Sequence, residues 1–196
     1  MLPWKHFPSA ISSDDSNRYY NALIKMVDKT PAKLVIYGKE CTEPRLTKAF
    51  ARKAGSMKYS GTEKEFDGEW PSIIEEIHTI ACKITDNKYT WDTVLINYYR
   101  DGNDYISYHS DKDGAGYPIM SFSFGAERPF FIKSKQEDTK YEILLKNGSA
   151  IFMMPTMQDD YKHSLPKRKK IKTGRINITF RNHGRELTDS QLTIQS

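Results

Sequence analysis

Cysteine is scarce in this 196-residue sequence, where Cys41 and Cys82 are the two examples. Their separation matches no metal-binding pattern and two cysteines make no disulfide framework, so we expect free thiols in a reducing compartment. Long hydrophobic runs are missing as well: no segment is long enough to span a bilayer, and residues 1–30 contain no apolar core of a signal peptide. We therefore expect an intracellular protein, nuclear and/or cytoplasmic, that does not associate with membranes.

Acidic residues are absent from two stretches of the sequence. Residues 45–58 contain five lysines and arginines and residues 162–175 contain seven, in a chain whose formal net charge is +5. Two such clusters in a folded chain suggest a polyanionic partner, of which nucleic acid is the obvious example. Charge alone fits equally well with two solvated faces that bind nothing.

Glycine, proline, asparagine and charged residues separate seven short β-rich runs in the second half of the chain. The runs are TVLINYY, YISY, IMSFSF, PFFIK, YEILL, SAIFMMP and INITFR. Two helices are predicted before them, one beginning near Ser12 and Ser13 and one at Pro71, which precedes isoleucines at helical spacing. Residues 1–11 look irregular, and residues 40–70 show no clear pattern. This order predicts a single-domain α+β fold in which N-terminal helices pack against a jelly-roll-like β-sandwich.

The run ISYHSDKDG, residues 106–114, combines a predicted strand with side chains that bind metals. Residues two apart on a strand share a face, so His109 and Asp111 converge, and Asp113 follows if the chain stays extended. A metal ion would fit there, although a His-x-Asp pair alone is common by chance. An iron(II) oxygenase site needs two histidines and a carboxylate. Of the five histidines we expect His163 to be the third ligand, because the others lie in the N-terminal extension, on a helix or near the C-terminus.

The strand RINITFR, twelve residues after the third histidine ligand, has two chemically different faces. Arg175, Asn177, Thr179 and Arg181 point one way, while the apolar residues between them point the other way. Two arginines on an inward face need carboxylate partners, because a buried guanidinium without one is costly. The strand therefore predicts a dianionic small molecule beside the metal. A polar face in solvent is the alternative, and the neighbouring metal ligands argue against it.

Three segments of the sequence resemble the AlkB family of iron(II)/2-oxoglutarate-dependent dioxygenases, most of all its eukaryotic nucleic-acid repair branch. They are LINYYRDGNDYISYHSDKD, PIMSFSFGAERPFFI and HSLPKRKKIKTGRINITFR, in the family's order. Weaker similarity in LVIYGKECTEPR and KYSG extends the resemblance to about residues 30–182. It implies a double-stranded β-helix (jelly-roll) core at about 91–182 and a nucleotide-recognition segment at about 30–70. One dioxygenase domain would span residues 1–184, and 185–196 would form a flexible tail.

The resemblance also implies a role for each matching residue of the site. The implied iron ligands are His109, Asp111 and His163. The residues implied to bind 2-oxoglutarate are Asn97, Tyr99 and Arg175 at the distal carboxylate, and Asn177 and Arg181 at the end that chelates iron. Together these residues predict Fe(II) as the cofactor, with 2-oxoglutarate and O2 as cosubstrates.

Further matches imply contacts with nucleic acid. Tyr59 and His109 would stack on the two faces of a flipped base, with Ser60 beside it. Asp113 would read the base edge, and Tyr37 would fill the gap that the base leaves in the duplex. The residues implied to contact phosphates are Lys167, Arg168, Lys169 and Lys170. Their run PKRKK also resembles a nuclear localisation signal, and the two interpretations are compatible.

The implied function is oxidative demethylation of N-alkylated bases such as 1-methyladenine and 3-methylcytosine. A monomeric enzyme would act on alkylated DNA, or also on RNA, and would reverse alkylation damage directly with release of formaldehyde and succinate. Two alternatives remain. The same fold could act on RNA methyl marks or on a protein side chain; a preference for 2′-hydroxyl groups favours RNA, and the basic clusters argue against protein. The domain could also bind nucleic acid without catalysis, which binding without 2-oxoglutarate turnover would favour.

Overall fold

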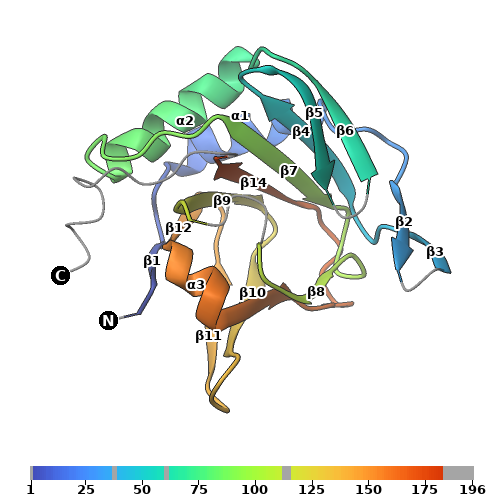
Figure 1. Ribbon diagram of the computed structural model, residues 1–196, viewed down its shortest axis with the longest axis vertical. Coiled ribbons are helices and arrows are strands. Elements are labelled where there is room, and N and C mark those ends of the chain that lie inside the picture. The colour runs from blue at the N-terminus through green and yellow to red at the C-terminus, as the bar shows by residue number, and fades with distance from the viewer. Residues whose placement is uncertain (1, 37–38, 60–61, 112–115, 183–196) are drawn as a thin grey trace.

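The computed structural model describes residues 2–36, 39–59, 62–111 and 116–182 and contains two antiparallel sheets that face each other (Figure 1). The larger sheet has the strand order β1-β12-β9-β14-β7-β4, and the smaller has the order β11-β10-β13-β8. The strands of the larger sheet are β1 Trp4–Phe7, β4 Leu46–Ala51, β7 Thr93–Tyr99, β9 Ile119–Gly125, β12 Ser149–Met153 and β14 Arg175–Arg181. Those of the smaller sheet are β8 Ile106–His109, β10 Arg128–Ser134, β11 Lys140–Leu145 and β13 Tyr161–Leu165. Strands β7 to β14 are divided equally between the two sheets, which confirms the jelly roll.

Two helices cover the outer face of the larger sheet (Figure 1). Helix α1 (Ser13–Leu23) begins after Ser12, whose hydroxyl accepts a hydrogen bond from the N–H of Asp15 at 3.2 Å. Helix α2 (Ser72–Ile84) begins after Pro71 and turns its isoleucine stripe inward. The main apolar core fills the space between helices and sheet. Its largest fully buried side chains are Trp91, Phe122, Phe124 and Phe180. Both helices are where the sequence predicts them.

Both edges of the larger sheet come from outside the jelly-roll strands. The prediction that residues 1–11 are irregular is wrong for β1, which pairs with β12. Trp4 explains this pairing, because its ring packs edge-on against Tyr141 and Tyr161 with centroids 5.0 and 5.2 Å away. Strand β4 forms the opposite edge by pairing with β7. The sequence could not show these additions, since each partner strand lies far away along the chain.

The segment expected to recognise nucleotides, at about 30–70, forms two hairpins in addition to β4. One consists of β2 (Lys33–Ile36) and β3 (Lys39–Thr42), and the other of β5 (Ala54–Tyr59) and β6 (Thr62–Asp67). Tyr59 is thus the last residue of β5. The predictions that lie outside the described residues are those for Tyr37, Ser60, Asp113 and the tail at 185–196.

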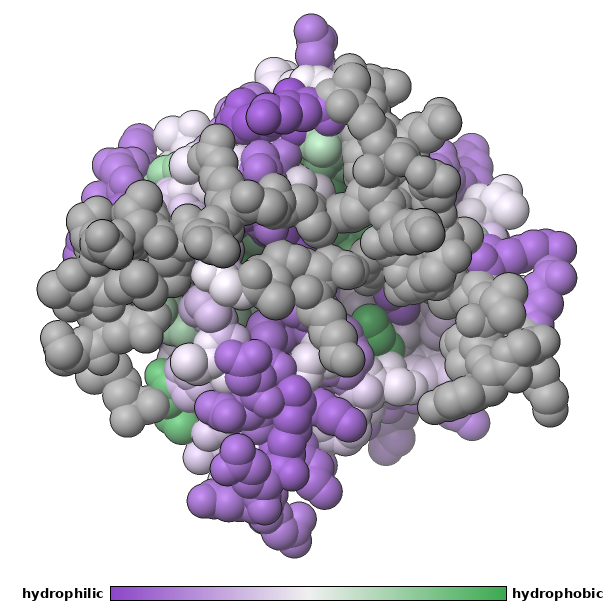
Figure 2. Space-filling model, in the orientation of Figure 1, coloured by the Kyte–Doolittle hydropathy of each residue, from purple (hydrophilic) through white to green (hydrophobic). Residues whose placement is uncertain are grey.

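A second apolar core lies between the two sheets. Its buried members are Tyr99, Ile119, Phe130, Ile132, Leu145, Ile151, Met153, Met157 and Leu165. Polar side chains of β7, β8 and β14 face the same interior and form the candidate site beside this core. On the face shown in Figure 2, hydrophilic residues gather over the β10–β11 hairpin. Within the described ranges, no helix has the length and apolar character that crossing a membrane requires.

Candidate active site

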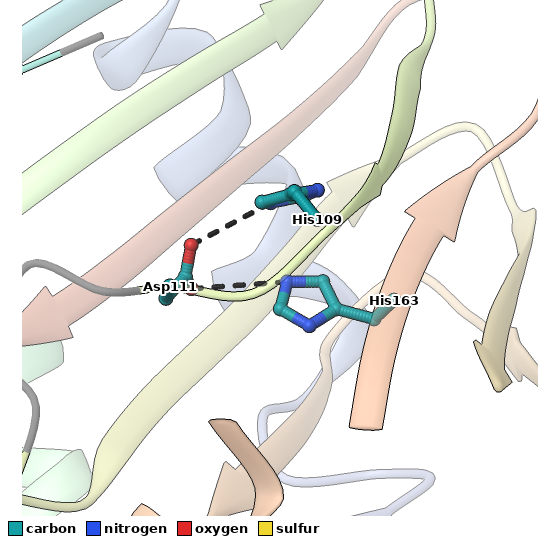
Figure 3. Close-up of side chains that lie close together, drawn as sticks. All are labelled: His109, Asp111 and His163. Carbon is teal, nitrogen blue, oxygen red and sulfur yellow. Dashed lines mark ion pairs between the residues drawn. The ribbon is translucent and has the colours of Figure 1, made fainter. Parts of the chain in front are cut away.

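The three side chains expected to bind iron lie together between the two sheets (Figure 3). His109 ends β8, and His163 lies directly opposite it on β13 because the two strands pair in that register. Asp111 follows and points back toward both rings. Its Oδ1 is 3.5 Å from His109 Nε2, and its Oδ2 is 3.8 Å from His163 Nε2. All three ligand atoms lie within 4.8 Å of one another, close enough for one metal ion to contact them after a small adjustment.

The protonation states of this cluster suit a metal ion. Asp111 and His163 are only 7% and 5% exposed. Burial alone would raise the pKa of Asp111. The positive charge of Arg181 outweighs this effect, with smaller contributions from contacts with the two histidines, and holds the pKa of Asp111 well below its usual range. Burial, reinforced by His109, lowers the pKa of His163 to about 3. A carboxylate anion and a neutral imidazole are the forms in which these side chains bind metals.

A backbone carbonyl orients the ring of His109. Its Nδ1 lies 2.8 Å from the carbonyl oxygen of Ser107, so Nδ1 carries the proton and donates it. Nε2, the other ring nitrogen, is the atom that faces Asp111 and is placed to bind a metal. Metal-binding histidines are commonly oriented by such a hydrogen bond from the other ring nitrogen. Two imidazole nitrogens and one carboxylate leave further coordination positions open, as in iron(II) oxygenases, so the donor set fits Fe(II).

Arg175 brings a buried positive charge to the same pocket. Its Nη2 donates to Ser123 Oγ at 2.8 Å, and its guanidinium carbon lies 5.3 Å from the centre of the Tyr99 ring. Burial lowers the pKa of Arg175 to about 10. Within the described part of the chain, its Nε has no hydrogen-bond acceptor. Because a buried guanidinium is costly without a partner, a carboxylate supplied by a ligand would stabilise this arrangement.

Arg181 lies at the metal end of the pocket. Its Nη2 is 2.9 Å from Asp111 Oδ1, so it is placed directly beside the carboxylate ligand. Arg175 and Arg181 come from the two ends of β14 and line the pocket together with Asn177 and Thr179. The apolar residues between them belong to the main core. The predicted alternation of this strand is confirmed.

Strand β7 adds Asn97 and Tyr99 to the pocket because it pairs with β14. Asn97 lies opposite Asn177, to whose Oδ1 it donates through Nδ2 at 3.3 Å. Tyr99 lies opposite Arg175. The structure therefore brings together all the residues expected to bind 2-oxoglutarate, and their contacts with that molecule stay a prediction.

A buried ion pair behind Asn97 was missed by the sequence analysis. Arg45 Nη2 lies 2.7 Å from Glu43 Oε1, and both residues are buried. Arg45 Nε also donates to Asn97 Oδ1 at 2.7 Å, so the pair orients a side chain of the pocket. In the sequence these two residues look like ordinary surface charges. No local signal marks them, because the pairing of β4 with β7 is what places them beside Asn97.

The basic cluster at residues 45–58 is less available than its composition suggests. Arg45 is buried, and both terminal nitrogens of Arg52 donate to the carboxylate of Glu75 at 2.7 and 2.6 Å. Lys48 lies 3.7 Å from an aspartate oxygen. Folding supplies each of these three side chains with an acidic partner, which reduces the positive charge that this cluster can offer to a polyanion.

The basic loop between β13 and β14 presents most of its charges to solvent. The exposed lysines are Lys167, Lys169, Lys170 and Lys172. Arg168 is half-buried, with its guanidinium 5.5 Å from the centre of the Phe131 ring. Gly102 anchors the loop, since its N–H donates to Ile171 O at 2.9 Å and its carbonyl accepts from Arg168 N–H at 2.7 Å. A Cβ at Gly102 would collide with the Arg168 carbonyl, so only glycine allows this contact. The loop is thus a defined basic surface, whose contact with phosphates stays a prediction.

Comparisons with known proteins agree with this geometry. The chain is 32% identical over 164 residues to DNA oxidative demethylase ALKBH2 from Mus musculus, which covers 76% of this chain and 66% of that protein. It is 31% identical over 152 residues to alpha-ketoglutarate-dependent dioxygenase alkB homolog 3 from Mus musculus, which covers 71% of this chain and 51% of that protein. The chain thus spans about half to two thirds of the length of these relatives.

Fold and family comparisons cover nearly the whole chain. A solved structure described as "The structure of OsALKBH1" shares the fold with a TM-score of 0.66 at 15% identity, over 92% of this chain and 98% of that one. The family model described as the 2OG-Fe(II) oxygenase superfamily matches residues 5–181. With the His-Asp-His cluster, this match confirms Fe(II), 2-oxoglutarate and O2 as cofactor and cosubstrates. The chain therefore belongs to the 2OG-Fe(II) oxygenase superfamily and, within it, to the AlkB family.

Proposed function

We propose that this protein is an oxidative demethylase of N-alkylated nucleic-acid bases. One observation carries the proposal: the cluster of His109, Asp111 and His163 opens on a pocket in which the guanidinium of Arg175 needs an anionic partner. Similarity to a relative named DNA oxidative demethylase supports nucleic acid as the substrate. The exposed lysines of the loop between β13 and β14 support the same class.

The reaction would couple two oxidations. Bound Fe(II) would supply the activation of O2 that oxidises 2-oxoglutarate to succinate and CO2 and hydroxylates the N-methyl group. One oxygen atom of O2 enters succinate, and the other enters the methyl group as a hydroxyl. The bond between the ring nitrogen and the hydroxymethyl carbon then breaks: its electron pair returns to the ring nitrogen and cancels the positive charge, the hydroxyl proton is released, and formaldehyde leaves. The repaired base is the product.

The protein would place the reactants and exclude water. Arg175, with Tyr99 beside it, would bind the distal carboxylate of 2-oxoglutarate through the guanidinium donors that the fold leaves available. Arg181 would keep Asp111 ionised and would lie near the end of 2-oxoglutarate that chelates the metal. Asn177 lies between the two arginines on the same face of β14 and would assist Arg181 at the end of 2-oxoglutarate that chelates the metal. Such positioning is the protein's main contribution to reactions of this kind.

Bases such as 1-methyladenine and 3-methylcytosine suit an enzyme that flips its substrate. Their methyl group blocks Watson–Crick pairing, so the base leaves the stack at lower cost than a normal base. Tyr59 and His109 would stack on the flipped base, with Ser60 beside it. Asp113 would attract the positive charge that methylation creates, and Tyr37 would fill the gap in the duplex.

The basic loop would bind the nucleic-acid backbone with little sequence preference. Its residues are Lys167, Arg168, Lys169 and Lys170. The same run would also serve as a nuclear localisation signal.

We propose that the protein is a monomer, nuclear and/or cytoplasmic, and that it acts as one dioxygenase domain over residues 1–184.

Mass spectrometry of a modified oligonucleotide tests the proposal. DNA and RNA strands with one 3-methylcytosine or 1-methyladenine are incubated with protein, Fe(II), 2-oxoglutarate and ascorbate. We expect the loss of one methylene mass, together with formation of succinate. His109→Ala should abolish both, while His6→Ala serves as a matched control because His6 lies on β1 outside the pocket.

The possible outcomes separate the alternatives. Demethylation of RNA but not DNA would favour the RNA demethylase. Succinate formation with an unchanged oligonucleotide would retain the oxygenase and reject these bases. Oligonucleotide binding without any turnover would support the non-catalytic module and contradict the proposal.

A further inference from the structure

The short helix α3 (Pro155–Asp160) links the two sheets near the metal cluster. It connects β12 to β13, the strand that carries His163 (Figure 1). Sequence patterns do not predict this helix, and no role in the site is expected for its residues. Gln158 on α3 is nevertheless only 7% exposed, which is unusual for a glutamine and requires partners for its amide.

The partner of Gln158 is a metal ligand's own backbone. Gln158 Oε1 accepts a hydrogen bond from the N–H of Asp111 at 2.8 Å. On the other side, Gln158 Nε2 lies 3.9 Å from Met153 Sδ, a weak acceptor. The orientation of the amide is therefore set by Asp111, because a buried backbone N–H without an acceptor is costly.

This contact connects the carboxylate ligand with the strand of the second histidine. Gln158 precedes His163 by five residues, and the intervening Tyr161 accepts a hydrogen bond through its carbonyl from Ser110 Oγ at 2.7 Å. Hydrogen bonds from the segment that leads to His163 thus fix the backbone around Asp111. Two ligands that are far apart in the sequence have one common support.

We propose that Gln158 is a positioning residue for the metal site: its side-chain oxygen fixes the backbone at Asp111 so that the carboxylate stays within reach of both histidine nitrogens. The inference rests on the metal site of the proposed function. Gln158 itself touches no ligand atom, and it acts through the Asp111 N–H. Partners of this kind typically change metal affinity by about 10–100-fold when they are removed.

Four variants separate positioning from a merely structural role. Gln158→Met keeps the length of the side chain but replaces the amide oxygen with a thioether sulfur, a far weaker acceptor. Gln158→Asn keeps the amide but shortens the side chain, so its oxygen no longer reaches the Asp111 N–H. Gln158→Glu retains an acceptor at the same place. Lys135→Met is the matched control, because Lys135 Nζ donates to the backbone carbonyl of Gln158 at 2.7 Å and so supports the same helix without touching Asp111.

The measurement is the affinity of the metal-free protein for Co(II) by isothermal titration calorimetry, with denaturant unfolding of each metal-free variant beside it. We expect Gln158→Met and Gln158→Asn to lose about 10–100-fold in Co(II) affinity, and Lys135→Met to change it by less than about threefold. Gln158→Glu should bind Co(II) at least as tightly as the wild type, because its added negative charge attracts the cation. Gln158→Met and Lys135→Met should both reduce the stability of the metal-free protein, since each loses a hydrogen bond to the same region. At saturating Fe(II), the loss of kcat in Gln158→Met and Gln158→Asn should be much smaller than their loss of metal affinity, because excess metal fills the weakened site.

Two results would overturn the proposal. Wild-type Co(II) affinity in both Gln158→Met and Gln158→Asn would show that the hydrogen bond does not position the ligand. An equal loss of affinity in Lys135→Met or Gln158→Glu would show that general loosening of α3 is the cause. If the wild-type protein binds no Co(II) in a manner that depends on His109, the metal site fails and the proposed function fails with it.

Discussion

Replacing Arg175 with methionine should raise the stability of the ligand-free protein while it weakens 2-oxoglutarate binding. The guanidinium is 2% exposed, and within the described ranges its Nε has no acceptor. It retains a hydrogen bond to Ser123 and a contact with the Tyr99 ring. Methionine has a similar length and no charge, so the substitution removes a costly buried charge with little change in packing.

The size of the effect follows from the pKa. Burial lowers the pKa of Arg175 from 12.5 to about 10, which corresponds to about 3 kcal/mol against the charged form. Loss of the hydrogen bond to Ser123 offsets about 1 kcal/mol of this. We expect Arg175→Met to raise the free energy of unfolding by about 2 kcal/mol. At pH 7 arginine is protonated in both the folded and the unfolded chain, so this gain should not vary with pH near neutrality.

Arg175→Met should weaken the binding of 2-oxoglutarate even though it raises the free energy of unfolding. Removing one partner of a buried charged hydrogen bond costs about 2–5 kcal/mol, so the Kd for 2-oxoglutarate should rise at least about 30-fold. Anaerobic calorimetry with Fe(II) measures the Kd, and denaturant unfolding measures the stability.

Arg128→Met is the matched control for this experiment. Arg128 is fully buried, but its guanidinium donates to the backbone carbonyls of Asp101, Asp104 and Pro166. Its removal leaves three acceptors without this donor and should lower the free energy of unfolding by about 3 kcal/mol or more. The Kd for 2-oxoglutarate should change far less than in Arg175→Met. If Arg175→Met destabilises the protein as Arg128→Met does and leaves the Kd unchanged, the reasoning is refuted.

Three further predictions concern pH, salt and the buried ion pair. Burial, with Arg52 nearby, lowers the pKa of His78 below 6.5, so between the two pKa values the unfolded chain binds more protons than the folded protein. The free energy of unfolding should therefore be intact above about pH 6.5 and fall below it. Denaturant unfolding should show a less steep fall in His78→Gln. Alanine at positions 167, 169 and 170 should reduce the slope of log K against log salt for oligonucleotide binding by about 2–3, measured by fluorescence anisotropy, and an unchanged slope would exclude the loop from the interface. Glu43→Gln should cost about 3 kcal/mol or more of stability and raise the Kd for 2-oxoglutarate, because it removes the carboxylate that holds Arg45 against Asn97; retention of both values would contradict this.

Local patterns in the sequence were sufficient for several features that depend on a few neighbouring residues. The alternation of residues 175–181 follows from strand geometry, and the structure shows the two faces that it predicts. Ser12 and Pro71 mark helix starts because capping involves only the first turn. His109 and Asp111 converge because they are two residues apart. The charge-bearing chemistry of the pocket could therefore be predicted without a structure.

Tertiary structure decided the features that depend on which strands pair. His163 lies opposite His109 only through the register of β13 and β8, and the sequence pointed to it by excluding other histidines. From the sequence alone, Arg45 belongs to a basic cluster, but the pairing of β4 with β7 buries it. Gln158 carries no signal in the sequence, and its contact with Asp111 exists because α3 folds back on the cluster. Each of these contacts joins residues that are distant along the chain. Sheet register determines the first two and the packing of α3 determines the third, and no local pattern encodes either.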